Sequence, residues 1–249
     1  MKNLIHAELL KLRTTRMIYG LALAALAFAA ISAISAISTA GRSGGGPALS
    51  TAAGIRNVMS AGLPGGILAL VIGILIMAGE FRHNTATSTF LISPHRGRVV
   101  GAKFAASALV GGALALLSSA VTLAVALPWL ATKHVHVDIF SRNVGLVLLG
   151  GIAAMTIYAT VGVGVGSLIR NQTAAVAIAL AWVLGVENLL VSFAHEIGRW
   201  TALGAAAALT NQQTNSDLLP MWGGALLFVA YGLAFAAAGT RFTMRRDVS

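Results

Sequence analysis

Six apolar runs, each long enough to cross a bilayer, constrain this chain more than any other feature of its sequence. They cover about residues 17–39, 61–79, 102–127, 144–169, 173–191 and 218–239. A membrane-spanning helix needs about 20 predominantly apolar residues, and inside lipid only helices and closed barrels satisfy the backbone polar groups. With 57% hydrophobic and 10% charged residues, the chain is too apolar for a soluble surface. We predict an all-α membrane protein with six transmembrane helices.

The chain length limits what else the protein contains. Six spans and their loops use most of the 249 residues, so we expect a single transmembrane domain over 1–249. Between the last two spans, residues 192–217 are mixed in character, and the Ala202–Leu209 stretch is too short to cross. We expect it to form an interfacial or re-entrant helix. The chain has no cysteine, which excludes disulfides and thiolate metal sites.

The basic residues are divided unequally between the two sides of the predicted bundle. An even number of spans places both termini on one side, together with the 80–103 loop and the loop at residue 170. Twelve basic residues fall on that side: Lys2, Lys11, Arg13, Arg16, Arg82, Arg96, Arg98, Lys103, Arg170, Arg241, Arg245 and Arg246. Five fall opposite: Arg42, Arg56, Lys133, Arg142 and Arg199. Cytoplasmic loops carry the excess of Lys and Arg, so we predict cytoplasmic termini in the plasma or inner membrane. The net charge of +10 is thereby explained without a nucleic-acid partner.

The first 16 residues predict a helix on the inner membrane surface. Apolar side chains recur on one helical face at Met1, Ile5, Leu9 and Leu12, and basic residues project elsewhere. This periodicity is typical of an amphipathic interfacial helix. The alternative is an ordinary basic flank of the first span.

The longest predicted cytoplasmic loop, residues 80–100, combines apolar and basic side chains. Phe81, Phe90 and Leu91 lie among charged and hydroxyl residues, and Pro94 ends the run. The pattern favours a short amphipathic helix that seats in a groove on a soluble partner. The alternative is a basic loop that only fixes the topology.

At this loop the chain resembles the ABC-2 type permeases of ABC transporters. Their loop after helix 2 typically reads Gly-Glu-aromatic-Arg-x-Gly-Thr, followed by a Leu-rich stretch, Pro, Arg and a later Lys. The matching positions here are Gly79, Glu80, Phe81, Arg82, Thr85, Leu91, Pro94, Arg96 and Lys103. The usual Gly before Thr is Asn84, which also tolerates the left-handed backbone conformation.

The resemblance implies a coupling helix that docks on a separate ATP-binding subunit. The predicted contact residues are Glu80, Phe81, Arg82, Thr85, Phe90, Leu91, Pro94, Arg96 and Lys103. It further implies two copies of that subunit, carrying ATP and Mg²⁺, and a second permease protomer, identical or not. None of the four lysines follows a glycine, so the chain lacks the Gly-Lys pair of a P-loop. We expect ATP to be hydrolysed on the partner and this chain not to be an enzyme.

The resemblance also places helices 2 and 5 along the transport route. Candidate lining residues on or near these helices are Met59, Met77, Trp182 and Glu187. An apolar lining favours export of a hydrophobic or amphipathic small molecule, such as a drug, an antibiotic or a lipid. Glu187 is alternatively an interfacial carboxylate that reaches water. The alternative function is a membrane binding or assembly factor that transports nothing.

Three polar motifs do not amount to catalytic or metal sites. Residues 41–44 have the form Gly-x-Ser-Gly, but no predicted later span contains the histidine that such a nucleophile needs. His195 opens a zinc-protease-like pattern, whose second histidine position is Arg199. The loop at 134–138 offers two histidines and an aspartate, for which a solvated outer loop is the favoured interpretation.

Small residues predict where helices approach closely. Alternating glycines near the inner end of the fourth span favour tight packing or bending, at Gly162, Gly164 and Gly166. In the first span, serines spaced by three favour a packing face, at Ser32, Ser35 and Ser38.

Overall fold

The computed structural model describes residues 1–82, 96–169, 171–210 and 218–245, and this part of the chain is helical without strands. The helices are α1 (Lys2–Thr14), α2 (Arg16–Thr39), α3 (Ala52–Met59), α4 (Gly66–Arg82), α6 (Arg96–Thr132), α7 (Arg142–Leu168), α8 (Gln172–Leu180), α9 (Asn188–Phe193), α10 (His195–Gly198), α11 (Ala202–Leu209) and α12 (Met221–Arg245). Two further elements are the 3₁₀ turn η1 (Leu63–Gly65) and the π-helical segment η2 (Ala181–Glu187).

Six helical stretches in the described chain are long and apolar enough to cross a membrane. They cover Arg16–Thr39, Ala52–Glu80, Gly97–Thr132, Arg142–Leu168, Gln172–Phe193 and Met221–Ala238. The predicted all-α fold with six spans is therefore confirmed, and the protein is a multi-pass membrane protein.

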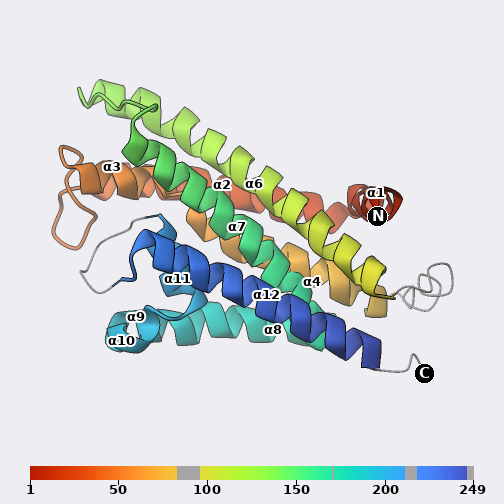
Figure 1. Ribbon diagram of the computed structural model, residues 1–249. Helices are drawn as coiled ribbons and strands as arrows, with labels where there is room; N and C mark the ends of the chain where they lie inside the picture. Colours follow the sequence, from red (N-terminus) through yellow and green to blue (C-terminus); the bar gives the residue numbers. More distant parts are fainter. Residues whose placement is uncertain (83–95, 170, 211–217, 246–249) are drawn as a thin grey trace.

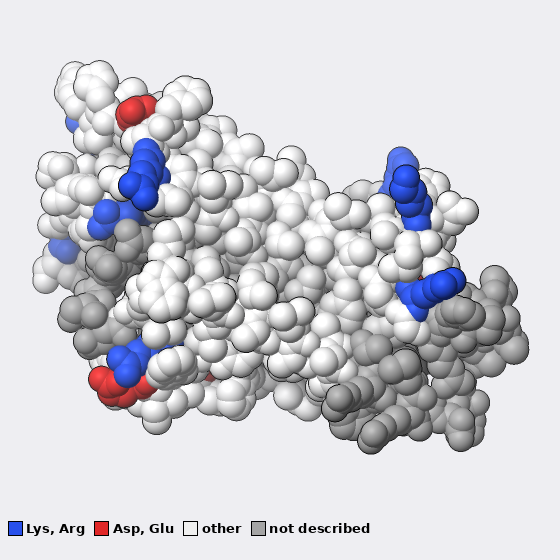
Figure 2. All heavy atoms as spheres, in the orientation of Figure 1, with Lys and Arg blue, Asp and Glu red and all other residues white. Residues whose placement is uncertain are grey.

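The long helices run side by side, and both ends of the chain lie at the same end of the bundle (Figure 1). α1 is seen nearly end-on in that view, so it runs across the bundle axis; its place at the inner membrane surface stays a prediction. Charged side chains gather at the two ends of the visible face, with an uncharged band between them (Figure 2). Such a band is what a lipid-facing surface needs.

α4 lies at the centre of the bundle, and its closest neighbour is α7. A Cβ on Gly73 would clash with the carbonyl of Ala159, and a Cβ on Gly162 would clash with that of Leu70. The two backbones are therefore in direct contact. Gly164 and Gly166 permit similar approaches, to Phe235 and Ile74. The predicted role of the three α7 glycines in close packing is confirmed.

The predicted packing face of the first span is wrong. The buried residues of α2 are Ala25, Ala29, Ala33 and Ile37, whereas Ser35 is exposed. Alanines at a spacing of four form a smooth face without a polar group to satisfy. Ser38 and Thr39 instead donate hydrogen bonds to the carbonyl of Ser35.

Two span boundaries also differ from prediction. The second span begins earlier than predicted, at the short helix α3; Thr51 caps this helix by accepting a hydrogen bond from the Gly54 N–H at 3.1 Å. α6 is longer than predicted, because Pro128 lies within its last turns and does not end it. At about 1.5 Å per residue, its 37 residues exceed the thickness of a hydrocarbon core, so α6 projects from the membrane.

α11 has the predicted bounds, Ala202–Leu209. Most of its residues are buried, and it packs against α7 and α12. This burial favours the re-entrant alternative over an interfacial helix.

Candidate functional site

Four charged side chains meet where α1 crosses the ends of α4 and α6. Lys103 Nζ lies 2.7 Å from Glu8 Oε2 and 2.8 Å from Glu80 Oε1. Lys11 Nζ lies 2.8 Å from Glu8 Oε1 and 3.0 Å from Glu80 Oε1. Each lysine contacts both carboxylates, so the four groups, which we call the charge cluster, form a closed ring of alternating sign.

The charge cluster is electrically balanced and largely buried. Lys103 is only 1% exposed, and Glu8 and Glu80 are also buried. Lys103 additionally donates to the Ile76 carbonyl at 3.4 Å. A buried charge is tolerated when it is paired and hydrogen-bonded, a condition that all three groups meet.

Lys11 is the half-exposed member of the charge cluster. Burial lowers the pKa of Lys11, but hydrogen bonds and attraction from Glu8 and Glu80 outweigh it, and the net pKa is raised above the ordinary value. Lys11 is therefore charged at neutral pH.

The charge cluster joins both ends of the predicted coupling segment to the N-terminal helix. Glu80 lies where the chain leaves α4, and Lys103 lies one to two turns into α6. Both belong to the residues predicted to contact a partner, and within this chain their side chains contact Glu8 and Lys11 of α1. The backbones of Phe81, Arg82 and Arg96 are helical. Thr85, Phe90, Leu91 and Pro94, like the predicted coupling helix, lie outside the described residues.

At the other end of the span formed by α8, η2 and α9, two predicted lining residues are in contact. Trp182 Nε1 donates a hydrogen bond of 2.8 Å to Glu187 Oε1. The two residues are five apart, and the wider π-helical turn brings residues at that spacing onto one face. Asn188 Nδ2 donates to the carbonyls of Val183 and Leu184, at 3.2 and 3.3 Å, and so satisfies carbonyls of the π segment.

Glu187 is buried against the start of α11. Its Oε2 accepts the backbone N–H of Leu203 at 2.9 Å, where unpaired N–H groups of a helix N-terminus favour negative charge. Trp182 and Glu187 both line a cavity of about 420 Å³ between α4, α7, the α8–η2 stretch, α11 and α12, which we call the Glu187 cavity.

Comparison with family models matches residues 4–188, more than half of the chain, to the ABC-2 family transporter proteins. The chain belongs to the ABC-2 transporter family. The match begins in α1 and ends just after η2, so both the charge cluster and Glu187 lie within it. Comparison with curated proteins gives no match.

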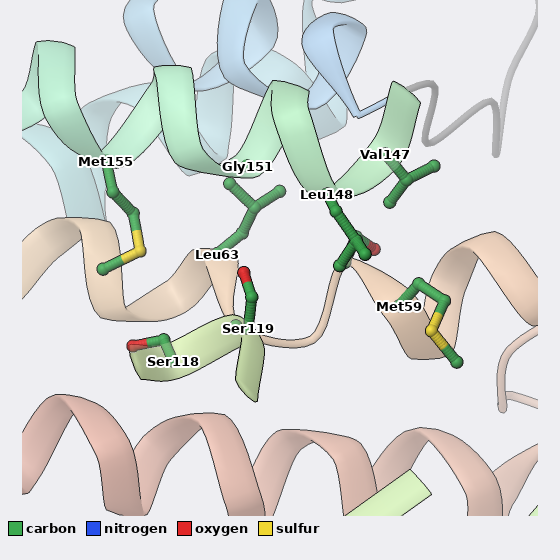
Figure 3. A pocket seen from close by; sticks show the side chains of 10 residues that line it. Met59, Leu63, Ser118, Ser119, Val147, Leu148, Gly151 and Met155 are labelled. Carbon is green, nitrogen blue, oxygen red and sulfur yellow. The ribbon is translucent and has the colours of Figure 1, made fainter. Parts of the chain in front are cut away.

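The other two predicted lining residues of this ABC-2 transporter lie elsewhere. Met77 is buried in the packing between α4 and α7. Met59, from the end of α3, lines a cavity of about 10 Å³ with Leu63, Ser118, Ser119, Val147, Leu148 and Met155 (Figure 3). That volume holds about one water molecule. The structure thus brings Trp182 and Glu187 together in a ligand-sized cavity, and neither methionine lines it.

Glu8 and Tyr158 are important residues that the sequence reading did not single out. Glu8 lies three residues after Ile5 and one residue before Leu9, which places it beside the apolar face of α1. This position was the signal that could have identified it. Tyr158 lines the Glu187 cavity, and its buried hydroxyl has no hydrogen-bond partner in the part of the chain that the structure describes. A tyrosine in an apolar helix carries no comparable signal in a single sequence.

The Gly-x-Ser-Gly motif and the two histidine motifs contribute no residue to the charge cluster or to the lining of the Glu187 cavity. Residues 41–44 form an exposed turn in which Gly41 and Gly44 adopt positive φ, at 73° and 79°. Within the described residues, no group of three or more His, Asp or Glu side chains is arranged to hold a metal ion.

Proposed function

We propose that this chain is the permease subunit of an ATP-driven exporter of hydrophobic or amphipathic small molecules, such as drugs, antibiotics or lipids. ATP and Mg²⁺ would bind a separate ABC subunit that docks on residues 80–100. The observation that carries the proposal is the charge cluster, which locks both ends of that segment to α1 in a chain of the ABC-2 family.

The charge cluster supports a simple route for mechanical coupling. A rigid ring of four ion pairs makes the ends of α4 and α6 move together with α1. α4 contacts α7 through backbone at Gly73 and Gly162, so a displacement of the segment reaches the centre of the bundle. The energy of ATP-driven closure in the partner would then shift an equilibrium between inward-facing and outward-facing states.

The proposed assembly has two permease protomers and two ATP-binding subunits in the plasma or inner membrane. Cytoplasmic termini are supported by the twelve-to-five distribution of basic residues and by the location of both termini at one end of the bundle. This orientation places the charge cluster next to the cytoplasm, where a soluble ATPase is available.

Cross-linking tests the docking directly, because the chain has no native cysteine. We expect Phe90→Cys to cross-link to the ATP-binding subunit that co-purifies from native membranes. Phe140→Cys is the matched control, since Phe140 is 97% exposed at the opposite end of the bundle. Absence of any co-purifying ATPase, or cross-linking only from Phe140→Cys, would favour an assembly factor without transport.

Charge reversal tests the coupling. Glu80→Lys places a third cation beside Lys11 and Lys103, so we expect substrate-stimulated ATPase activity to fall about tenfold or more, a barrier change of about 1.4 kcal/mol. Asp138→Asn, an exposed carboxylate at the other end, is the control. Unchanged stimulation in a correctly inserted Glu80→Lys protein would contradict the proposed route.

A further inference from the structure

We propose that the Glu187 cavity binds a lipophilic cation, a bulky organic molecule with one delocalised or shielded positive charge. This inference rests on the proposed transport function and names its substrate class. It is drawn from the charge balance, the lining and the accessibility of the cavity.

The Glu187 carboxyl group has no basic partner among the described residues, because no Lys or Arg there lies at ion-pair distance from it. The two oxygens are held by an indole N–H and a backbone N–H, which orient the group without neutralising it. A buried carboxylate in a membrane span is costly unless a cation compensates it. A cationic ligand would supply that charge.

The lining of the cavity suits a bulky organic cation. Apolar side chains make up most of the wall, with four aromatic residues among them: Tyr158, Trp182, Tyr231 and Phe235. Aromatic faces attract cations, most strongly where water is excluded. A volume of about 420 Å³ lies within the range of sites for drug-sized molecules.

Three hydroxyl groups lie in the wall of the cavity, on Tyr158, Thr201 and Tyr231. Thr201 and Tyr231 already donate to backbone carbonyls, at 2.8 and 2.6 Å. Among the hydroxyls of the wall, that of Tyr158 is buried and has no hydrogen-bond partner among the described residues, which leaves one polar position for a ligand. Its ring is fixed by an edge-to-face contact with Phe228 at 5.0 Å and by close packing on Gly66. The site therefore offers one charge, one hydroxyl and aromatic faces.

The cavity is accessible from the apolar surface. Trp182 is 52% exposed, and Ile178, one helical turn away, is similarly exposed. Ile178 and Trp182 both line the cavity, so the cavity reaches the apolar surface at these two residues. A hydrophobic cation dissolved in the bilayer reaches this opening without crossing water.

The test is equilibrium binding to the purified full-length chain in lipid nanodiscs, without its ATPase partner. The probes are tetraphenylphosphonium and tetraphenylborate, which share shape and apolar area but carry opposite charge. We expect the wild-type protein to bind the cation and not the anion. Glu187→Gln should weaken cation binding about tenfold or more. The matched control, Glu196→Gln, removes an exposed carboxylate paired with Arg199 at the same end and should leave binding unchanged.

A second variant keeps the test valid if Glu187→Gln does not fold. Trp182→Phe keeps an aromatic ring but offers a weaker cation-binding face than indole, so we expect cation binding to fall while the preference for the cation over the anion remains. Cation binding that is unchanged or stronger in Trp182→Phe would contradict an aromatic wall that attracts the cation. Equal binding of cation and anion, or equal cation binding by wild type and Glu187→Gln, would overturn the proposal. If a second copy of the chain fills the cavity, the monomer will bind the cation and the dimer will not. That result would also overturn the proposal. Because no ATPase is present, these results are independent of the coupling experiments.

Discussion

The two ends of the molecule differ in whether their buried carboxyl groups are paired with lysines. At one end, Glu8 and Glu80 are each contacted by two lysines, and the charge cluster is neutral overall. At the other end, Glu187 has N–H donors but no described cationic partner. The charge cluster needs no further cation to neutralise its carboxylates, and it is suited to hold helices together. An unbalanced carboxylate is suited to a charged ligand that comes and goes.

Removing Lys103 should have the largest effect on stability. Lys103→Met leaves Glu8 and Glu80 facing each other with only half-exposed Lys11 between them. Breaking a buried ion pair by removing one partner costs about 3–5 kcal/mol. We expect a loss of that size in reversible unfolding by denaturing detergent. Loss of less than about 1 kcal/mol would show that the charge cluster does not hold α1 in place.

Glu8→Gln should destabilise the fold by a smaller amount, about 2 kcal/mol, because the amide oxygen still accepts a hydrogen bond while the charge is lost. Its specific readout is the position of α1. Proteolysis between α1 and α2 should become faster in Glu8→Gln than in wild type, whereas Glu196→Gln should not change it. Unchanged proteolysis with lowered stability would contradict a tie between α1 and the rest of the bundle.

Glu187→Gln should change the free energy of unfolding less than Lys103→Met or Glu8→Gln. The substitution replaces a carboxyl group that no described Lys or Arg contacts, and glutamine still accepts from the Leu203 N–H. Because no described ion pair is broken, the weakened bond to Trp182 should be the main loss, about 1 kcal/mol or less. The unfolding experiment used for Glu8→Gln checks this. A loss as large as that of Glu8→Gln would mean that Glu187 is compensated in the native protein.

The sequence predicted the spans and their number well, because a bilayer requires long apolar helices whatever their tertiary contacts. The glycines of α7 were also interpreted correctly, since only very small residues permit backbone contact. The serines of α2 were wrongly predicted to form a packing face, because the small size of a side chain does not show which face of a helix is buried. Glu80 and Lys103 were recognised by their motif, but their inward direction depends on Glu8, which is 72 residues from Glu80 in sequence.

The Glu187 site shows a different limit of sequence reading. Trp182 and Glu187 are five residues apart, which places them on different faces of an α-helix. Their contact depends on the π-helical segment, whose wider turn is not encoded in any apolar periodicity. Thr201, by contrast, is a recognisable N-cap, accepting from the Gly204 N–H at 3.1 Å, and α11 had the predicted bounds.

The smallest expected effect concerns Lys11, whose half-exposed position allows water to screen its interactions. Lys11→Met should cost at most about 1 kcal/mol at neutral pH. Because the folded pKa is raised, the contribution of Lys11 is fully present below the ordinary lysine value and is lost as pH rises through the folded value. The stability difference between wild type and Lys11→Met should therefore vanish only in strongly alkaline solution. Lys11→Arg, which stays charged there, should keep its stability advantage over Lys11→Met at a pH where wild type has lost its own. If wild type and Lys11→Arg lose stability in parallel, deprotonation of Lys11 is not what loosens this end of the molecule.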